Sequence, residues 1–364
     1  MEQSDFIPLP LEWHNNSWGG NEAFFSYLDE GHTGNHSVKT EITSYASGDA
    51  KWYYTPQPIL PGKEYRFTDY YKSNTISRVV LMVEKNNGSL QYLELKSADP
   101  TTTWTKYSDT FLAPIDAKTI SVFHLISSVG WLITDDYSII EYQIQGFNRS
   151  LISLTFDDAW EQNIYTAFPI LDQYGFKTSQ YYCTQYIKNE DDKNAIRGIY
   201  QSGHEIGSHS VTHPFLTQLS DADLHFELTE SKRVLEDIVG IGNINGFVTP
   251  YGDYNPTVTT AIMQYYDYNR NTISGFNSKD NLDIYNIRVQ NMTPDITLAE
   301  FQSWIDQAIT NKLWLVIVYH DVTNNPDPYD VSPENFSAQM QYLAGTGITV
   351  SRVSDALSEL LPQL

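Results

Sequence analysis

The 364-residue sequence predicts two domains of different fold class: an all-β sandwich over residues 1–146 and an α/β domain over residues 147–364. Its length exceeds the ~250–300 residues at which a single hydrophobic core stops growing. Short β-forming runs recur between turn signals in the first part, with no helical pattern between them. After residue 147, apolar strand-like runs alternate with helical patterns, and this alternation is typical of a parallel sheet.

The strands of the first domain are predicted from runs of apolar, aromatic and β-branched residues. These runs occupy residues 50–54, 65–71, 78–83, 90–93 and 119–125. Pro61-Gly62 and Asn86-Asn87-Gly88 supply turn signals between them. Because the strands are short and regularly spaced, the sequence predicts a two-sheet sandwich or jelly roll.

The second domain is predicted to alternate strands with helices. Strand-like apolar runs occupy residues 151–156, 179–182, 247–248, 286–289 and 314–319. Helical patterns cover residues 164–174, 221–239, 298–310 and 332–344, and Gly240 ends the second of them. Such a chain forms a parallel sheet, open or closed into a barrel, with its reactive groups at the carboxyl ends of the strands.

The composition limits the partners of the protein. The 22 basic and 45 acidic residues give a formal net charge of −23, so nucleic acid and anionic membrane surfaces would be repelled. A neutral polymer or a small neutral substrate is compatible with this charge. Aromatic residues make up 14% of the chain, and we expect most of them to fill cores. Some rings can instead stack on the apolar faces of sugars, and the candidates in the first domain are Trp13, Trp18, Trp52, Trp104 and Trp131.

The chain has a single cysteine, Cys183, so it cannot form an internal disulfide, and the apolar neighbours of Cys183 indicate a buried structural thiol. No stretch is long and apolar enough for a transmembrane helix. The first residues lack the basic and apolar regions of a signal peptide. The sequence therefore leaves open a cytoplasmic protein and an exported one whose signal has been removed.

Two adjacent carboxylates, Asp157 and Asp158, follow the buried strand 151–156. Like charges this close resist joint ionisation, and a bound cation relieves that cost. A polar turn with an N-cap would explain one aspartate well and two poorly. The pair therefore predicts a metal site at this strand end.

Three histidines extend this site. His209 and His213 are four residues apart, and on a helical turn this spacing places both imidazoles on one face, where they can bind one ion. His204 lies upstream on a strand and is expected to pack or hydrogen-bond. A lone histidine is usually structural, but His320 ends the apolar strand 314–319 on the same rim, which favours a role in the site.

Together these segments resemble the polysaccharide deacetylase family, also called the NodB-homology or carbohydrate esterase family 4 fold. The resemblance covers residues 150–360 and implies a distorted (β/α) barrel of the NodB type. In Thr155-Phe156-Asp157-Asp158, it implies that Asp157 is the general base and that Asp158 binds the metal. In the segment 209–214, it implies that His209 and His213 are the other ligands of Zn²⁺ or of another divalent transition metal.

Two later motifs supply the rest of the site that the resemblance implies. Thr249-Pro250-Tyr251-Gly252 matches the third motif, in which the tyrosine N–H helps to form the oxyanion hole. Val318-Tyr319-His320 matches the fifth motif, in which the histidine is the general acid.

The sequence also departs from the family pattern. Val248 stands where the third motif commonly has an arginine that supports the catalytic aspartate, and no clear copy of the fourth motif is present. Arg270 or Arg288 can reach Asp157 from a neighbouring strand. We prefer Arg270, although a surface ion pair is an equal interpretation of that residue.

The first domain resembles the β-jelly-roll carbohydrate-binding modules of secreted polysaccharide hydrolases. The resemblance rests on segments such as Leu9-Pro10-Leu11-Glu12-Trp13, Pro61-Gly62-Lys63 and Asp135-Asp136-Tyr137. Many such modules hold a structural Ca²⁺, and Glu12 and Asp136 would be the matching carboxylates. The alternative, two ordinary surface acids, is about as well supported.

The function implied by the resemblance is the metal-dependent removal of acetyl groups, chiefly N-acetyl, from a sugar polymer such as chitin, peptidoglycan or poly-N-acetylglucosamine. Two alternatives are an acetylxylan-type O-acetyl esterase and a catalytically silent carbohydrate-binding protein. Because such polymers lie outside the cell, the family also implies a secreted, cell-surface or periplasmic location. The sequence does not indicate an oligomeric state.

Overall fold

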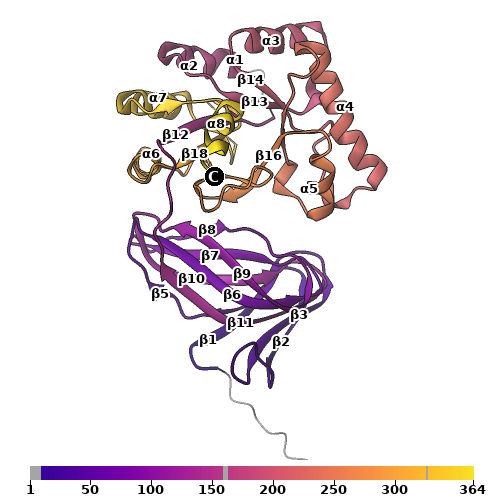
Figure 1. The fold of residues 1–364 in the computed structure, drawn as a ribbon, viewed down its shortest axis with the longest axis vertical. Helices are drawn as coiled ribbons and strands as arrows, with labels where there is room; N and C mark the ends of the chain where they lie inside the picture. The colour runs from indigo at the N-terminus through magenta and orange to yellow at the C-terminus, as the bar shows by residue number, and fades with distance from the viewer. Residues whose placement is uncertain (1–9, 159–162, 325–326) are drawn as a thin grey trace, which may run out of the picture. The chain divides into compact units, whose positions relative to one another are not determined.

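The computed structural model describes residues 10–158, 163–324 and 327–364. The chain divides into two compact units, Met1–Gln143 and Ile144–Leu364. The expected boundary, after residue 146, lies close to this division. Each unit has its own fold class, as Figure 1 shows.

The first unit consists of two antiparallel sheets, which confirms the predicted jelly-roll-like sandwich. One sheet contains β1 (Trp13–Trp18), β4 (Asp49–Tyr54), β10 (Ala117–Ile126), β7 (Arg78–Lys85) and β8 (Leu90–Glu94) in this order, and β5 (Gln57–Pro58) pairs with β10. The other contains β2 (Asn21–Leu28), β3 (Ser37–Tyr45), β11 (Gly130–Glu141), β6 (Glu64–Ser73) and β9 (Thr101–Leu112). In β6, Phe67 and Tyr71 are buried in the core, whereas Arg66 and Tyr70 alternate with them and are only half-buried.

The second unit is a closed barrel of seven parallel strands. The strands are β12 (Leu151–Phe156), β13 (Ser179–Tyr182), β14 (Glu205–Ser208), β15 (Gly246–Val248), β16 (Tyr268–Ser274), β17 (Ile287–Asn291) and β18 (Trp314–Tyr319). Each pairs with the next, and β12 pairs with both β13 and β18, which closes the ring. The short β19 (Thr349–Val350) adds to β12. The pairing of β16 with β17 has a register shift between Arg270 and Ser274, in agreement with the expected distorted barrel.

Helices surround these strands in Figure 1. They are α1 (Asn163–Thr166), α2 (Phe168–Tyr174), α3 (Glu190–Gln201), α4 (Asp221–Val239), α5 (Pro256–Ile262), α6 (Leu298–Asn311), α7 (Pro333–Thr346) and α8 (Val353–Leu360). The short 3₁₀ helices are η1 (Thr184–Tyr186), η2 (Leu216–Gln218), η3 (Pro250–Gly252) and η4 (Leu361–Gln363). No helix in the described ranges has both the length and the apolar character that a membrane span needs.

Local signals account for the helix ends. The Ser220 side chain accepts a hydrogen bond from the Asp223 N–H at the start of α4, and Gly240 follows its end with a φ of 101°. At α3, Asn189 and Asp192 form a reciprocal capping box. The predicted helices over 221–239, 298–310 and 332–344 are confirmed within one or two residues.

Candidate active site

The predicted site residues gather at the carboxyl end of the barrel. Asp157 and Asp158 follow β12, His209 follows β14, Tyr251 follows β15 and His320 follows β18. Since parallel strands end at the same rim, residues far apart in the sequence meet there. Each of these residues lies in a loop that begins where a strand ends, and the conformation of the loop orients its side chain.

Asp158, His209 and His213 form a compact group. The Nε2 atom of each histidine lies 3.7 Å from Oδ1 of Asp158, and the two Nε2 atoms are 3.0 Å apart. Nδ1 of His209 lies 2.8 Å from the Val248 carbonyl oxygen, and because a carbonyl can only accept, Nδ1 donates. Burial lowers the pKa of His209 to about 3, so the ring is neutral and its Nε2 presents a lone pair to the other two groups.

These three residues could hold a divalent metal ion. One ligand atom from each lies within 4.8 Å of the others. Two imidazole nitrogens and one carboxylate oxygen are a donor set that zinc accepts, with further positions open. The lone pair of the His209 Nε2 lies 3.0 Å from the His213 Nε2 and 3.7 Å from an oxygen of Asp158, so the three residues fit such an ion.

The prediction of a helical turn between His209 and His213 is wrong. Ser210 and His213 both have left-handed backbone angles, with φ values of 67° and 59°, so the segment is a loop. Glu227 of α4 holds this loop: its carboxylate accepts hydrogen bonds from the N–H groups of Val211 and Thr212, at 2.7 and 2.9 Å, and from the Thr212 hydroxyl at 2.6 Å. Glu227 could have been identified from the sequence, because it is the one acidic residue on the otherwise apolar and neutral buried face of α4.

The structure places Arg270, the preferred one of the two candidate arginines, against Asp157. Its Nη2 donates to both carboxylate oxygens of Asp157. Arg270 is only 1% exposed, so the alternative of a surface ion pair is wrong. Arg288 instead donates to the Ser274 carbonyl, at 3.3 Å. Val248 and Arg270 are paired neighbours on β15 and β16, so the positive charge enters from the next strand.

The two aspartates titrate differently. Burial raises the pKa of Asp157, but Arg270 above all, together with the neighbouring His209 and His320, outweighs burial and holds the pKa below its usual range. The pKa of Asp158 is raised to about 6, by burial first and then by the negative charge of Asp157. Asp157 is therefore a carboxylate at neutral pH and can accept a proton.

Tyr251 adopts a strained backbone conformation at the rim. Its φ of 58° is in the left-handed region, which is rare for a bulky residue and recurs at functional sites. Gly252 follows with a φ of 64°, and a Cβ there would lie 2.1 Å from Oγ1 of Thr272. The turn is thus specified locally, and the Tyr251 ring packs edge-on against His213, with ring centroids 4.3 Å apart.

His320 is fixed through its backbone. Asn163, buried in α1, donates from Nδ2 to the His320 carbonyl at 2.8 Å and accepts from the Val322 N–H at 2.9 Å. The Tyr329 ring lies 5.5 Å from the His320 ring. Nδ1 of His320 has no hydrogen-bond partner within the described residues, so no carboxylate there orients the ring. Asn163 was not identified from the sequence, because a lone asparagine at a helix start carries no distinctive signal.

Residues 145–269 match the family model described as polysaccharide deacetylase. This part of the chain is a polysaccharide deacetylase domain. The match begins at the start of the second unit and includes both motifs that supply the aspartates and the histidine pair.

Several known proteins are similar to parts of the chain. The YxkH protein of Bacillus subtilis is 23% identical over 236 residues, 58% of this chain and 82% of that protein. A chitooligosaccharide deacetylase of Azorhizobium caulinodans is 25% identical over 116 residues, 32% of this chain and 54% of that protein. A gellan lyase of a Bacillus species is 34% identical over 143 residues, 39% of this chain but 6% of that protein. The chain thus spans less than two thirds of the length of the last two relatives.

Among solved structures, a family 4 acetyl xylan esterase from Clostridium thermocellum is similar at 20% sequence identity, with a TM-score of 0.44. The similarity covers 57% of this chain and 90% of that one.

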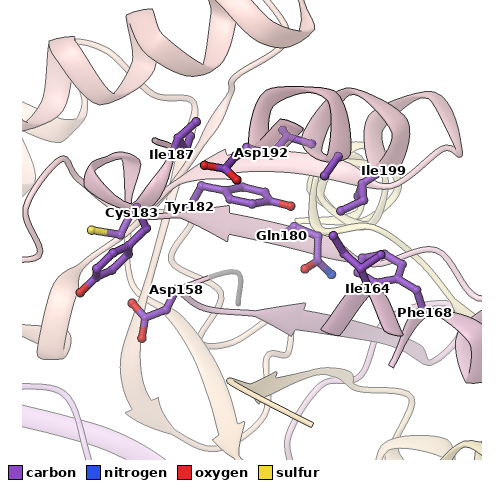
Figure 2. Close-up of a pocket in the computed structure, with 12 residues that line it drawn as sticks. Asp158, Ile164, Phe168, Gln180, Tyr182, Cys183, Ile187, Asp192 and Ile199 are labelled. Carbon is purple, nitrogen blue, oxygen red and sulfur yellow. The ribbon is translucent and has the colours of Figure 1, made fainter. Parts of the chain in front are cut away.

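The deacetylase domain also has a pocket beside Asp158, His209 and His213, the candidate metal-ligand group. Asp158 lines it together with Gln180 and Tyr182 of β13, and Figure 2 shows Ile164, Phe168 and Ile199 at its far end. Its volume is about 200 Å³. Cys183 belongs to this lining and is buried, as expected, and burial raises the pKa of its thiol to about 11.

Outside the deacetylase domain, the predicted calcium pair has separate partners. Glu12 accepts from the Tyr54 hydroxyl, whereas Asp136 lies 2.7 Å from Nδ1 of His32 and accepts from Thr33. Within the described residues, a cluster of three acidic, histidine or cysteine side chains occurs at Asp158 and not at this pair. The calcium site stays a prediction.

The tryptophans of the first unit differ in exposure. Trp52 is 2% exposed and belongs to the core, whereas Trp18 is 61% exposed. Trp13 lines a cavity of about 390 Å³ together with Tyr54 and Tyr137. Trp52 is therefore not available to a sugar, and the remaining four are at least partly exposed.

Proposed function

We propose that the protein is a metal-dependent hydrolase that removes acetyl groups, chiefly N-acetyl, from a sugar polymer. The observation that carries this proposal is the placement of a base and an acid beside the ligand group. Asp157 is next to the proposed ligand Asp158 and is held ionised by Arg270, and His320 follows β18, the strand that pairs with β12.

The metal would be Zn²⁺ or another divalent transition metal held by Asp158, His209 and His213. Such an ion, when bound, polarises the acetyl carbonyl and lowers the pKa of a water molecule from ~15.7 toward ~7. The remaining steps belong to side chains and backbone groups of the barrel rim.

Asp157 accepts the proton of the attacking water, because its low pKa keeps it ionised at neutral pH. The Tyr251 N–H, presented by the left-handed turn, donates to the oxygen that gains negative charge as the carbonyl is attacked. His320, as an imidazolium, donates a proton to the sugar amine, which leaves as a neutral group. An O-acetyl ester could use the same groups, so acetylated xylan is a second candidate substrate.

The substrate is tested by measuring acetate release from chitin oligomers, peptidoglycan, poly-N-acetylglucosamine and acetylated xylan, together with the metal content of the purified protein. We expect release from an N-acetylated polymer by metal-loaded protein. Release from xylan alone would favour the esterase. No release from any polymer, with metal bound, would favour a silent binding protein. The structural arguments for it are Val248 and the His320 Nδ1, which has no partner in the part of the chain that the structure describes.

A further inference from the structure

Exposed aromatic side chains of the deacetylase domain concentrate on the rim of the metal-ligand group. Six aromatic residues are exposed among the described residues of the second unit: Tyr165, Tyr186, Phe215, Phe226, Tyr251 and Tyr329. Five of them follow the carboxyl ends of β12, β13, β14, β15 and β18. Phe226, in the second turn of α4, is the exception because it lies on a long helix. Exposed apolar groups gathered around one site indicate a binding surface.

On one side of the ligand group, two rings form a stacked pair. Phe215 and Tyr251 have centroids 4.3 Å apart and planes inclined by 19°, and Tyr251 in turn contacts His213. Phe215 is 47% exposed although it contacts this ring, so much of its surface is open to a ligand. On the same side, Tyr186 lines the pocket that Asp158 also lines.

On the β18 side, Tyr329 is 61% exposed and lies beside His320, the proposed proton donor to the leaving group. Around the barrel, β12 and β13 lie between β18 and β14 in the shorter direction. The Tyr329 ring and the Phe215 ring thus follow well-separated strands, and the ligand group formed after β12 and β14 lies between these positions.

We propose that Phe215 and Tyr329 form stacking subsites on the two sides of the metal site, which bind consecutive units of one neutral, acetylated sugar chain. Flat aromatic faces suit the apolar faces of sugar rings, and the net charge of −23 disfavours an acidic polymer. The protein therefore deacetylates units within a chain in preference to single sugars. This proposal rests on the proposed function and names the form of the substrate.

The test measures binding in a variant that does not turn over, Asp157→Asn, loaded with Zn²⁺. Titration calorimetry compares N-acetylglucosamine oligomers of two and six units, in this background and with Phe215→Ala, Tyr329→Ala or Phe226→Ala added. Phe226→Ala is the matched control, because it removes a comparably exposed ring from a helix instead of from a rim loop. We expect tighter binding of the longer oligomer, weakened by about 2- to 12-fold for each rim ring and unchanged by the control.

The Zn²⁺ content of Phe215→Ala and Tyr329→Ala, each with Asp157 intact, shows whether these variants keep a folded site. We expect both to bind as much Zn²⁺ as the wild type, because neither ring is among the three proposed ligands. Equal binding of both oligomers, or rim variants that bind like the control, would overturn the subsites. If the long oligomer binds through the rings but the wild type releases no acetate from it, the subsites hold and the proposed function is wrong.

Discussion

Arg270 donates to both carboxylate oxygens of Asp157, and both side chains are buried. The contact joins residues on β16 and at the end of β12, and it supplies the positive charge that Val248 cannot. The same guanidinium also donates from Nη1 to the Asn271 carbonyl, at 3.2 Å, and the compact ammonium group of a lysine cannot reproduce both contacts.

Arg270→Lys should therefore lower kcat by about 10- to 100-fold, as expected for a group that orients a reacting residue, with little change in metal content. Because the weaker pairing lets the pKa of Asp157 rise, the acid limb of the kcat–pH profile should move to higher pH. Arg288→Lys is the control, since Arg288 is also buried on the neighbouring strand but does not contact Asp157. An unchanged acid limb would argue against the positioning role.

Substitution of the proposed general base, Asp157, or the proposed general acid, His320, should lower catalysis without loss of the metal. Asp157→Asn and His320→Ala should each lower kcat by about 10²- to 10⁴-fold while zinc still binds, because neither residue belongs to the ligand group. His213→Ala should instead lose metal and activity together. Turnover and metal content per mole of protein are the two measurements. Wild-type turnover in Asp157→Asn or His320→Ala would remove that residue from the mechanism.

Chelation should remove activity reversibly. A chelator is expected to abolish acetate release and to lower the Tm of the deacetylase domain, because a ligand that binds only the folded state stabilises it by about 2.7 kcal/mol at 100 times its Kd. Added Zn²⁺ should restore both quantities. In His213→Ala the chelator should leave Tm unchanged. If the wild type kept its activity in the presence of the chelator, its activity would not depend on a readily removed metal.

The strand ends of the site could be predicted from the sequence because long apolar runs place Asp157 and His320 directly at the barrel rim. The sequence limited the possible partners of Asp157 to two arginines. The choice between them depends on the pairing of β16 with β15, which the sequence does not show. The path of residues 209–213 was predicted wrongly. Spacing alone suggests a helical turn, whereas the loop depends on Glu227, which lies on a different element. Contacts of this kind are long-range and leave little local pattern in a single sequence.

Helix α3 is the opposite case, because a local sequence signal marks its start although the hydrophobic pattern did not predict a helix there. Asn189 and Asp192 have the spacing of a capping box, followed by a helix in which Ile196 is buried. The acidic first turn resembles a solvated loop in composition, and the apolar face is short. Capping residues would therefore have identified this helix where hydrophobic periodicity was weak.

His204 should make stability depend on pH. Burial lowers its pKa to about 4, and its Nδ1 lies 2.8 Å from the Thr178 hydroxyl. The unfolded chain, with a pKa near 6.5, binds the proton more readily, so stability is complete above pH ~6.5 and is lost as pH falls toward 4. At most about 3 kcal/mol is at stake, given ~1.4 kcal/mol for each pH unit.

Urea unfolding of the wild type and of His204→Gln at several pH values measures this effect. Because glutamine does not titrate, the variant should lose less stability than the wild type between pH 6.5 and 4. The comparison uses the difference between two pH values, so a uniform loss of stability in the variant does not affect it. Parallel curves for the two proteins would show that His204 is not responsible.

A buried serine, histidine and aspartate in the first unit resemble a hydrolase triad but are expected to be structural. Nδ1 of His124 lies 2.6 Å from Oδ2 of Asp69, and Nε2 lies 2.8 Å from the Ser77 hydroxyl. All three are at most 1% exposed, so no substrate can reach the serine. Ser77→Ala should therefore leave acetate release unchanged.

His124→Leu should instead destabilise the first unit. It removes the partner of the Asp69 carboxylate, whose Oδ1 already has no hydrogen-bond partner within the described residues. Leaving one member of a buried pair without its partner costs about 3–5 kcal/mol, whereas replacing both members with apolar residues is often nearly neutral. Asp69→Leu combined with His124→Leu should therefore recover part of the loss. Urea unfolding measures each variant, with the exposed His14→Leu as a control expected within ~0.5 kcal/mol of the wild type. A His124→Leu protein as stable as this control would show that the buried pair contributes nothing to the fold.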